Sequence, residues 1–151
     1  MIYLTIHGRS IFMVTPYINF NGKCKEAMSF YQIVFKTEVK SAIPYGDYIP
    51  EGVEVPTENL GEWIMHAEME ICDTIFWFAD ETQPVSSGDM VKLNATVLTA
   101  ALGQEYFDKL KEGGNITLPP TETYYSNFHA ALVDRFGICW NIVSKEPPSQ
   151  H

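Results

Sequence analysis

The sequence repeats one order of secondary structure in its two halves: a strand, an amphipathic helix, and further strands that end in a hairpin. In the first half, residues 13–20 alternate as a strand does, and apolar residues at helical spacing follow over residues 23–35. In the second half, residues 91–97 alternate and a helix is predicted over residues 103–112. The helix of such a unit covers one sheet face, and the other face must meet something. The repeat therefore predicts an α+β fold of tandem βαβββ modules, forming a curved, incompletely closed mixed sheet with helices outside and a cleft within.

Three local signals refine this prediction. Asn21 precedes the first helix and is a residue type that caps helix N-termini. Pro119-Pro120 is predicted to interrupt the strand that starts at residue 116, because proline cannot donate to a sheet ladder. Residues 44–62 are rich in proline and glycine and too long for a hairpin turn, so they form either a mobile flap or a disordered loop.

The pattern divides the chain into five segments. Residues 1–12 do not share the pattern of the first half and are predicted to be an N-terminal extension, or else an extra edge strand, because apolar and polar side chains alternate over residues 2–7. The remaining segments are a first βαβββ module (13–80), a linker (81–89), a second βαβββ module (90–143) and a flexible tail (144–151).

Charge and cysteine content narrow the class of protein. The formal net charge of −9 opposes binding to nucleic acid, whereas a cationic or neutral small ligand is compatible with it. The three cysteines are far apart and odd in number, which argues against a disulfide framework and indicates reduced thiols in a cytoplasmic protein. No apolar run reaches the length of a membrane-spanning helix, so no membrane partner is expected.

Three stretches carry a family resemblance: TPYINFNG and EAMSFY in the first half, and DRFGICW in the second. With their flanking residues they resemble the PhnB-like branch of the glyoxalase, bleomycin-resistance and extradiol-dioxygenase superfamily, also called the vicinal oxygen chelate superfamily. The resemblance covers about residues 13–143 and implies tandem βαβββ modules, usually in a homodimer. Many such sequences are labelled as ubiquinone methyltransferase domains, but no glycine-rich loop follows a strand here to support methyl transfer.

Metal-dependent members of the superfamily hold a divalent ion with His and Glu side chains from the first and last strands of each half. At the matching places this sequence carries residues that are poor or unlikely ligands, namely Tyr17, Asn19, Trp77, Lys92, Asn94 and Asn141. Lys92 would also bring its own positive charge. We therefore expect no divalent metal at this site and no other cofactor.

A polar cleft without a metal remains. The predicted ligand-binding residues are Tyr17, Asn19, Trp77, Lys92, Asn94, Tyr125 and Asn141. His66 and Glu68 lie two residues apart on one strand, so they share a face and are the candidate acid–base pair. Each of these residues also has a purely structural interpretation. His66 and Glu68 can be a partly exposed polar pair, His129 a core or rim residue, and Tyr125 a packing residue at a dimer interface.

The sequence alone is compatible with three functions. The first is binding of a small organic molecule. The second is a lyase, isomerase or dioxygenase-type enzyme that depends on a metal or on His66 and Glu68, and the third is a non-catalytic dimeric interaction protein. The resemblance favours the first of these, because bleomycin-resistance relatives act by sequestration.

Overall fold

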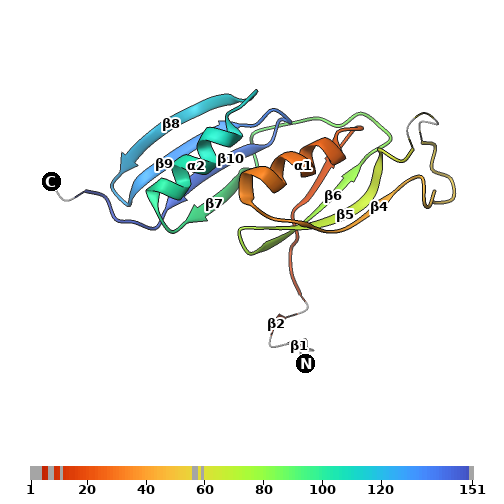
Figure 1. Cartoon of the computed structure of the whole chain (residues 1–151), viewed down its shortest axis with the longest axis horizontal. Coiled ribbons are helices and arrows are strands. Elements are labelled where there is room, and N and C mark those ends of the chain that lie inside the picture. The colour runs from red at the N-terminus through yellow and green to blue at the C-terminus, as the bar shows by residue number, and fades with distance from the viewer. Residues whose placement is uncertain (1–4, 7–8, 11, 56–57, 59, 150–151) are drawn as a thin grey trace.

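The computed structural model describes residues 5–6, 9–10, 12–55, 58 and 60–149, and builds them around two four-stranded mixed sheets that lie side by side (Figure 1). The first module consists of β3 (Tyr17–Phe20), α1 (Cys24–Phe35), β4 (Val39–Pro44), β5 (Ile64–Ile71) and β6 (Thr74–Asp80). The second consists of β7 (Leu93–Val97), α2 (Ala100–Leu110), β8 (Asn115–Thr123), β9 (Ser126–Val133) and β10 (Cys139–Ser144).

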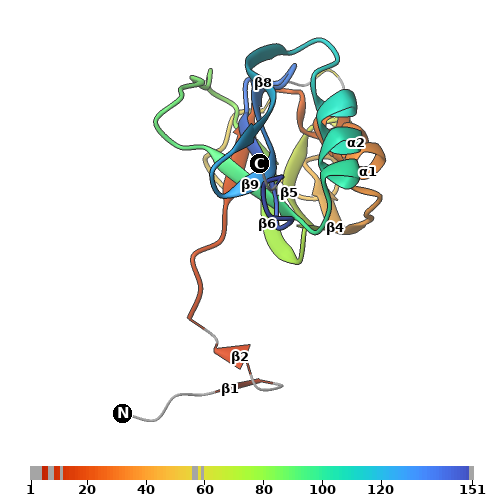
Figure 2. The same ribbon diagram turned by 90° about the vertical axis from the view of Figure 1, so that its left-hand side faces the viewer.

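Both sheets have the same internal order. The strand orders are β3-β6-β5-β4 and β7-β10-β9-β8, so each module places its first strand beside its last. That pairing is parallel in each sheet, and the other pairings are antiparallel. Both helices cover the same side of the molecule (Figure 2). The predicted α+β class and the tandem βαβββ arrangement are confirmed, and neither sheet closes into a barrel.

The start of α1 is fixed by a distant carboxylate. Asp80, at the end of β6, is 1% exposed and accepts hydrogen bonds from the backbone N–H of Cys24 (3.0 Å) and of Ile64 (2.9 Å). Asn21 instead donates its side-chain amide to the carbonyl of Glu81 at 2.9 Å. The prediction that Asn21 caps this helix is wrong, because Asp80 satisfies the free N–H group from across the module.

A distant carboxylate also caps the helix of the second module. Glu146 follows β10 and accepts a 2.8 Å hydrogen bond from the backbone N–H of Ala100, the first residue of α2. Thr99 adds a local cap by accepting from the N–H of Leu102. These caps start the helix at Ala100, ahead of the predicted start at residue 103. In each module, then, a carboxylate at or just after the end of the last strand accepts a hydrogen bond from the first residue of the helix.

The proline pair does not break β8 as the sequence suggests. The strand runs from Asn115 to Thr123 through Pro119 and Pro120, with register shifts against β9. β8 is the outermost strand of its sheet, and an edge strand tolerates residues without an N–H because one of its sides has no ladder to complete.

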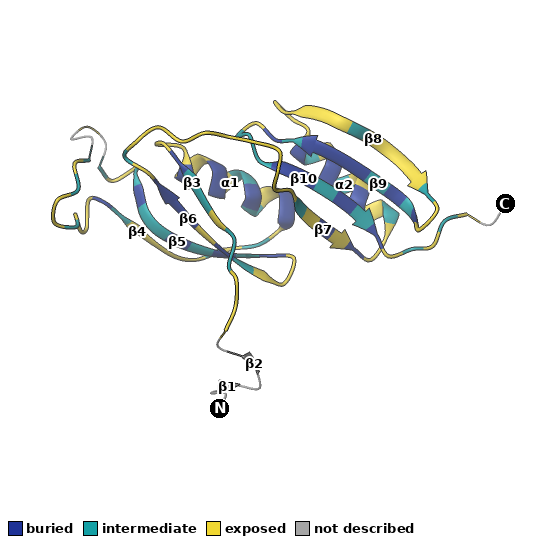
Figure 3. Ribbon diagram, turned by 180° about the vertical axis from the view of Figure 1, so that it is seen from behind, coloured by how far each residue is buried: buried dark blue, intermediate teal, exposed yellow. Residues whose placement is uncertain are grey.

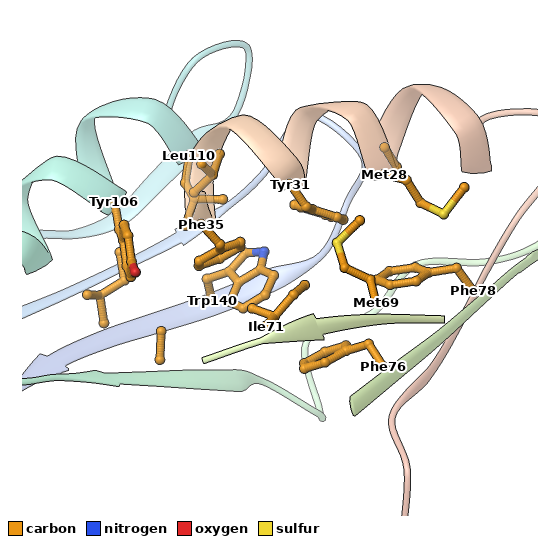
Figure 4. Packing of buried hydrophobic residues seen from close by; sticks show 14 of the residues in the cluster. Met28, Tyr31, Phe35, Met69, Ile71, Phe76, Phe78, Tyr106, Leu110 and Trp140 are labelled. Carbon is orange, nitrogen blue, oxygen red and sulfur yellow. The ribbon is translucent and has the colours of Figure 1, made fainter. Parts of the chain in front are cut away.

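One hydrophobic core joins the two modules beneath the helices (Figure 4). The ring of Phe35 on α1 packs against Tyr106 on α2 and Trp140 on β10, with centroid separations of 5.0 and 5.2 Å. Phe76 on β6 stacks on the same Trp140 at 6.5 Å. Buried side chains of the two modules therefore form one continuous hydrophobic cluster.

The N-terminal segment projects from this body (Figure 1). Within it, β1 (Thr5–Ile6) and β2 (Arg9–Ser10) pair with each other in a sheet of their own. The other parts of the predicted extension, except Phe12, lie outside the described residues, as do residues 150–151 of the predicted tail. None of the helices in the described ranges is long and apolar enough to cross a membrane.

Candidate ligand-binding site

Three aromatic rings meet on the face of the first sheet that points away from α1. They belong to Tyr17 on β3, His66 on β5 and Trp77 on β6, and we call them the aromatic cluster. Their ring centroids are 5.9 Å apart for Tyr17–His66, 5.8 Å for Tyr17–Trp77 and 5.2 Å for His66–Trp77. The interplanar angles of 75°, 89° and 74° make every pair edge-to-face, the arrangement that aromatic quadrupoles favour.

Strand register explains why these side chains meet. Trp77 pairs directly with Tyr17 on one side and with Glu68 on the other, which puts the three in one row across the sheet. The face is open on the side seen in Figure 3, and Tyr17 and Trp77 are 47% and 38% exposed. Large aromatic side chains left open in a row are more informative than scattered apolar ones, since contiguous exposed patches usually mark binding surfaces.

Glu68 is hydrogen-bonded to one member of the aromatic cluster, Trp77. Its Oε2 accepts a 3.2 Å hydrogen bond from the indole Nε1 of Trp77. Within the described part of the chain, His66 makes ring contacts with Tyr17 and Trp77 and no hydrogen bond to Glu68. The two residues predicted as an acid–base pair thus share a face, and each contacts the indole of Trp77.

A pocket of about 990 Å³ lies in the seam between the modules. Tyr17 and Asn19 of β3 form part of its wall, which also includes Val85 of the linker and Phe136 of the β9–β10 turn. The side-chain Oδ1 of Asn19 is buried and, within the described ranges, has no hydrogen-bond donor. An acceptor left without a donor costs free energy, which a bound donor group or water would recover.

Burial and one neighbouring carboxylate act on the phenol of Tyr17. Burial raises the pKa of its phenol, and the carboxylate of Glu81 and the thiol of Cys24 raise it further. Glu81 also lines the pocket. The two basic side chains of the pocket wall are each paired with a carboxylate: Lys23 with Glu26, which also lines the pocket, at 2.8 Å, and Arg135 with Glu112 at 3.8 Å.

The second sheet carries a separate polar group. Asn141 on β10 pairs in register with Asn94 on β7, on the face opposite α2. The side-chain amide of Asn94 donates to Thr96 Oγ1 at 2.9 Å. Lys92 is exposed and lies just before β7, which begins at Leu93.

A tyrosine–histidine pair completes this second group. The Tyr125 hydroxyl lies 2.7 Å from Nδ1 of His129, across the turn from β8 to β9. The Nε2 of His129 is buried, and the described residues offer it no partner. The sequence predicted Tyr125 as a ligand residue and His129 as a core or rim residue. The spacing of four residues across a tight turn is the signal that could have joined them.

The predicted residues thus fall on two sheets. Tyr17, Asn19, His66, Glu68 and Trp77 belong to the first and Asn94 and Asn141 to the second, with Lys92 just before β7 and Tyr125 in the turn between β8 and β9. No strand of one sheet pairs with a strand of the other in the described ranges.

The donor set does not suit the superfamily's divalent ion. Over the described residues, no three His, Cys, Asp or Glu side chains converge as metal ligands would. At the expected positions β3 offers a phenol and an amide, β6 an indole, and β7 and β10 an amide each. Hard or borderline divalent ions prefer carboxylate and imidazole ligands, so these side chains do not fit such an ion.

Comparison with known proteins places these features in a family. A family model described as 3-demethylubiquinone-9 3-methyltransferase matches residues 13–143. Protein YjdN of Escherichia coli (strain K12) is 26% identical over 148 residues, covering 91% of this chain and 99% of that protein.

Two solved structures are similar over most of the chain. Protein PA1353 from Pseudomonas aeruginosa has 26% sequence identity and a TM-score of 0.77, covering 89% of this chain and 98% of that one. The PhnB protein from Bacillus cereus has 25% identity and a TM-score of 0.71, covering 87% and 98%.

Proposed function

Because the chain belongs to the family described as 3-demethylubiquinone-9 3-methyltransferase, the PhnB-like branch of the glyoxalase superfamily, we propose that it binds a small organic molecule on the open faces of its sheets. The aromatic cluster carries this proposal. Tyr17 and Trp77 remain 47% and 38% exposed, whereas Phe20 and Phe78 on the same two strands are buried in the core. An apolar wall with a few placed polar groups, here Glu68 and Asn19, is the usual composition of a ligand site.

The proposal does not include methyl transfer. A methyl-donor site of the nucleotide-binding kind needs a glycine-rich turn between a strand and a helix. Here the connection from β3 to α1 is Asn21-Gly22-Lys23, with a single glycine. A Cβ on Gly22 would lie 2.9 Å from the ring of Trp63, and the residue has a φ of +78°. Turn geometry and the packing of Trp63 account for this glycine without a cofactor.

Acid–base catalysis by His66 and Glu68 is the second candidate function, after ligand binding. A general base needs its proton partner within hydrogen-bond reach and usually an orienting group. The Glu68 carboxylate accepts a hydrogen bond from Trp77, and the described residues show none between Glu68 and His66. The arrangement therefore supports ligand binding more directly than proton transfer.

We also propose that two copies associate, as the family resemblance implies. β3 and β7 are both outermost strands of their sheets, so each leaves one side of its backbone without a strand partner in the described ranges. Exposed strand edges are normally covered. Pairing the first sheet of one copy with the second sheet of another would bring the aromatic cluster opposite Asn94, Tyr125 and Asn141. We place this dimer in the cytoplasm, where three thiols remain reduced.

Ligand binding is tested by thermal denaturation of wild-type protein against a diverse library of small organic molecules. Compounds at a hundred times their Kd should raise stability by about 2.7 kcal/mol and shift Tm by several degrees. The shift should be lost in Trp77→Leu and kept in Tyr48→Leu, an exposed aromatic of the 44–62 loop. The proposal is refuted if no compound raises the Tm, or if the compounds raise the Tm of Trp77→Leu as much as that of wild type.

The association is tested by light scattering during gel filtration. A dimer should have twice the chain mass of 17.1 kDa over a hundredfold dilution into the micromolar range. A mass of one chain at every concentration contradicts the dimer. A dimer that binds no compound would instead favour a non-catalytic interaction protein.

A further inference from the structure

We infer that the aromatic cluster with Glu68 is a site for an organic cation, such as a quaternary or protonated amine; this rests on the proposed function and names its ligand class. The site combines three aromatic rings with the carboxylate of Glu68. None of its members Tyr17, His66, Trp77 and Glu68 is a basic residue of the Lys or Arg type. A cation is the ligand that all of these groups attract together.

Ring geometry is the first support. The three rings are close to mutually perpendicular, with angles of 74° to 89°, so their planes meet like the sides of a corner. Centroid separations of 5.2 to 5.9 Å leave no gap between the rings, so a cation would sit on the open side of the corner. There it can lie within about 6 Å of an indole or phenol centroid, the range of a cation–π contact.

The carboxylate is the second support. Glu68 lies in the same row as Trp77 and accepts the indole N–H, which fixes its position beside the ring. Donation of the indole N–H to a carboxylate also adds electron density to the ring, which strengthens its attraction for a cation. One oxygen accepts this bond at 3.2 Å, and a carboxylate has further lone pairs for a ligand.

Local charge is the third support. Glu81 adds a second carboxylate near Tyr17, while Lys23 and Arg135 on the pocket wall are engaged with Glu26 and Glu112. The net charge of −9 has the same sign as this local field. An anionic ligand would have to overcome both, whereas a cation gains from both.

The test uses choline and its neutral isostere 3,3-dimethyl-1-butanol, in which carbon replaces the quaternary nitrogen. Each is titrated into full-length ¹⁵N-labelled protein at constant ionic strength, and the three indole N–H resonances are followed. Trp77→Phe identifies the resonance of Trp77. Trp140 serves as an internal control because it is 2% exposed and bonded to Asp134.

We expect choline to shift the Trp77 resonance saturably and to bind about tenfold tighter than the isostere, which corresponds to about 1.4 kcal/mol. Glu68→Gln keeps the shape and an acceptor for the indole, and should weaken choline about fivefold while changing the isostere less than twofold. Asp108→Asn makes the same charge change on α2, where the carboxylate pairs with Lys111, and should leave both probes unaffected.

Equal binding of the two probes, tighter binding of the isostere, or no saturable Trp77 shift with choline overturns the inference. So does a Glu68→Gln protein with unchanged choline affinity. These failures are distinguishable from failure of the proposed function. If neutral compounds bind at Trp77 without a preference for charge, the small-molecule site stands and only its cation class is lost; if no library compound binds there, both are lost.

Discussion

The phenolic oxygen of Tyr31 on α1 lies 2.6 Å from Oδ2 of Asp134, a residue 103 positions later in the turn between β9 and β10. Both side chains are buried, and this hydrogen bond joins the first module to the second. Asp134 also accepts from Trp140 Nε1 at 2.9 Å and from the backbone N–H groups of Phe136 and Ile138. One buried carboxylate therefore holds the turn, the core indole and the neighbouring module together.

Removing the Tyr31 hydroxyl should weaken the joint between the modules. Tyr31→Phe deletes one donor to a buried carboxylate, and we expect the free energy of unfolding to fall by about 2 kcal/mol. Asp134→Ala should cost more, because it leaves Trp140 and two backbone N–H groups unsatisfied. Urea denaturation measures both. Tyr124→Phe, at a position 91% exposed, is the control, and a loss in Tyr31→Phe no larger than in this control would contradict the role.

Alkaline pH should destabilise the protein partly through the same tyrosine. Burial, followed by the charge of Asp134, raises the pKa of Tyr31 well above its ordinary value of 10.0. Above pH 10 the unfolded chain releases this proton while the folded chain keeps it, so stability is complete below that pH and declines above it. Tyr31→Phe should reduce the slope by up to about 1.4 kcal/mol per pH unit between pH 10 and 11. Identical slopes for the two proteins would count against this account.

Acid should loosen the start of α2. The hydrogen bond from the Ala100 backbone and the one from the Asn127 side chain hold the pKa of Glu146 below its ordinary value of 4.5. A lowered carboxyl pKa gives stability that is present above that ordinary value and is lost as pH falls through the folded-state pKa. In hydrogen exchange at pH 6, Glu146→Ala should expose the first-turn amides of α2 a few-fold faster than in wild type.

Lowering the pH provides the control for Glu146. Protonation removes its charge, so wild type and Glu146→Ala should converge as the pH drops below the lowered pKa. Amides in the last turn of α2 should be unaffected at either pH. Equal first-turn exchange at pH 6 would show that Thr99 caps the helix unaided.

Gly103 is expected to resist replacement even though it lies inside a helix. Alanine normally gains about 1 kcal/mol over glycine there. A Cβ on Gly103, however, would lie 2.8 Å from Cδ1 of Phe128, which is 5% exposed and held in the core. We expect Gly103→Ala to lower stability by about 1–3 kcal/mol through overpacking. Adding Phe128→Leu should recover part of that loss beyond additivity, whereas a stabilised Gly103→Ala would show that the ring moves freely.

Most of the fold was predictable from periodicity because both helices and the alternating strands face one shared core. Periodicity could not show which hydrogen bonds form between polar groups that are far apart in the sequence. Asp80 caps a helix 56 residues earlier and Glu146 one 46 residues earlier, and neither spacing leaves a local pattern. The path of β8 through Pro119 and Pro120 depended likewise on its place at the sheet edge, which only the strand order reveals.

For the candidate site, the sequence predicted which side chains share a strand face but not which strands bring them together. Period-two alternation correctly put His66 and Glu68 on one face of their strand. It could not give the register that sets Trp77 beside Glu68, because register depends on the hairpin between β5 and β6. Glu68 accepts a hydrogen bond from Trp77 in the structure, and the role of His66 and Glu68 as an acid–base pair stays a prediction.

The two carboxylate caps also bear on how the chain could be divided. Asp80 closes the first module onto the start of its own helix, and Glu146 does so for the second, so neither helix depends on the other half for its cap. A cut in the linker at residues 81–89 would sever none of these bonds. The two fragments would each carry a complete set of strands and an intact helix start. Reassembly would then rest on the Tyr31–Asp134 contact and the shared aromatic core, which makes this chain suited to fragment complementation.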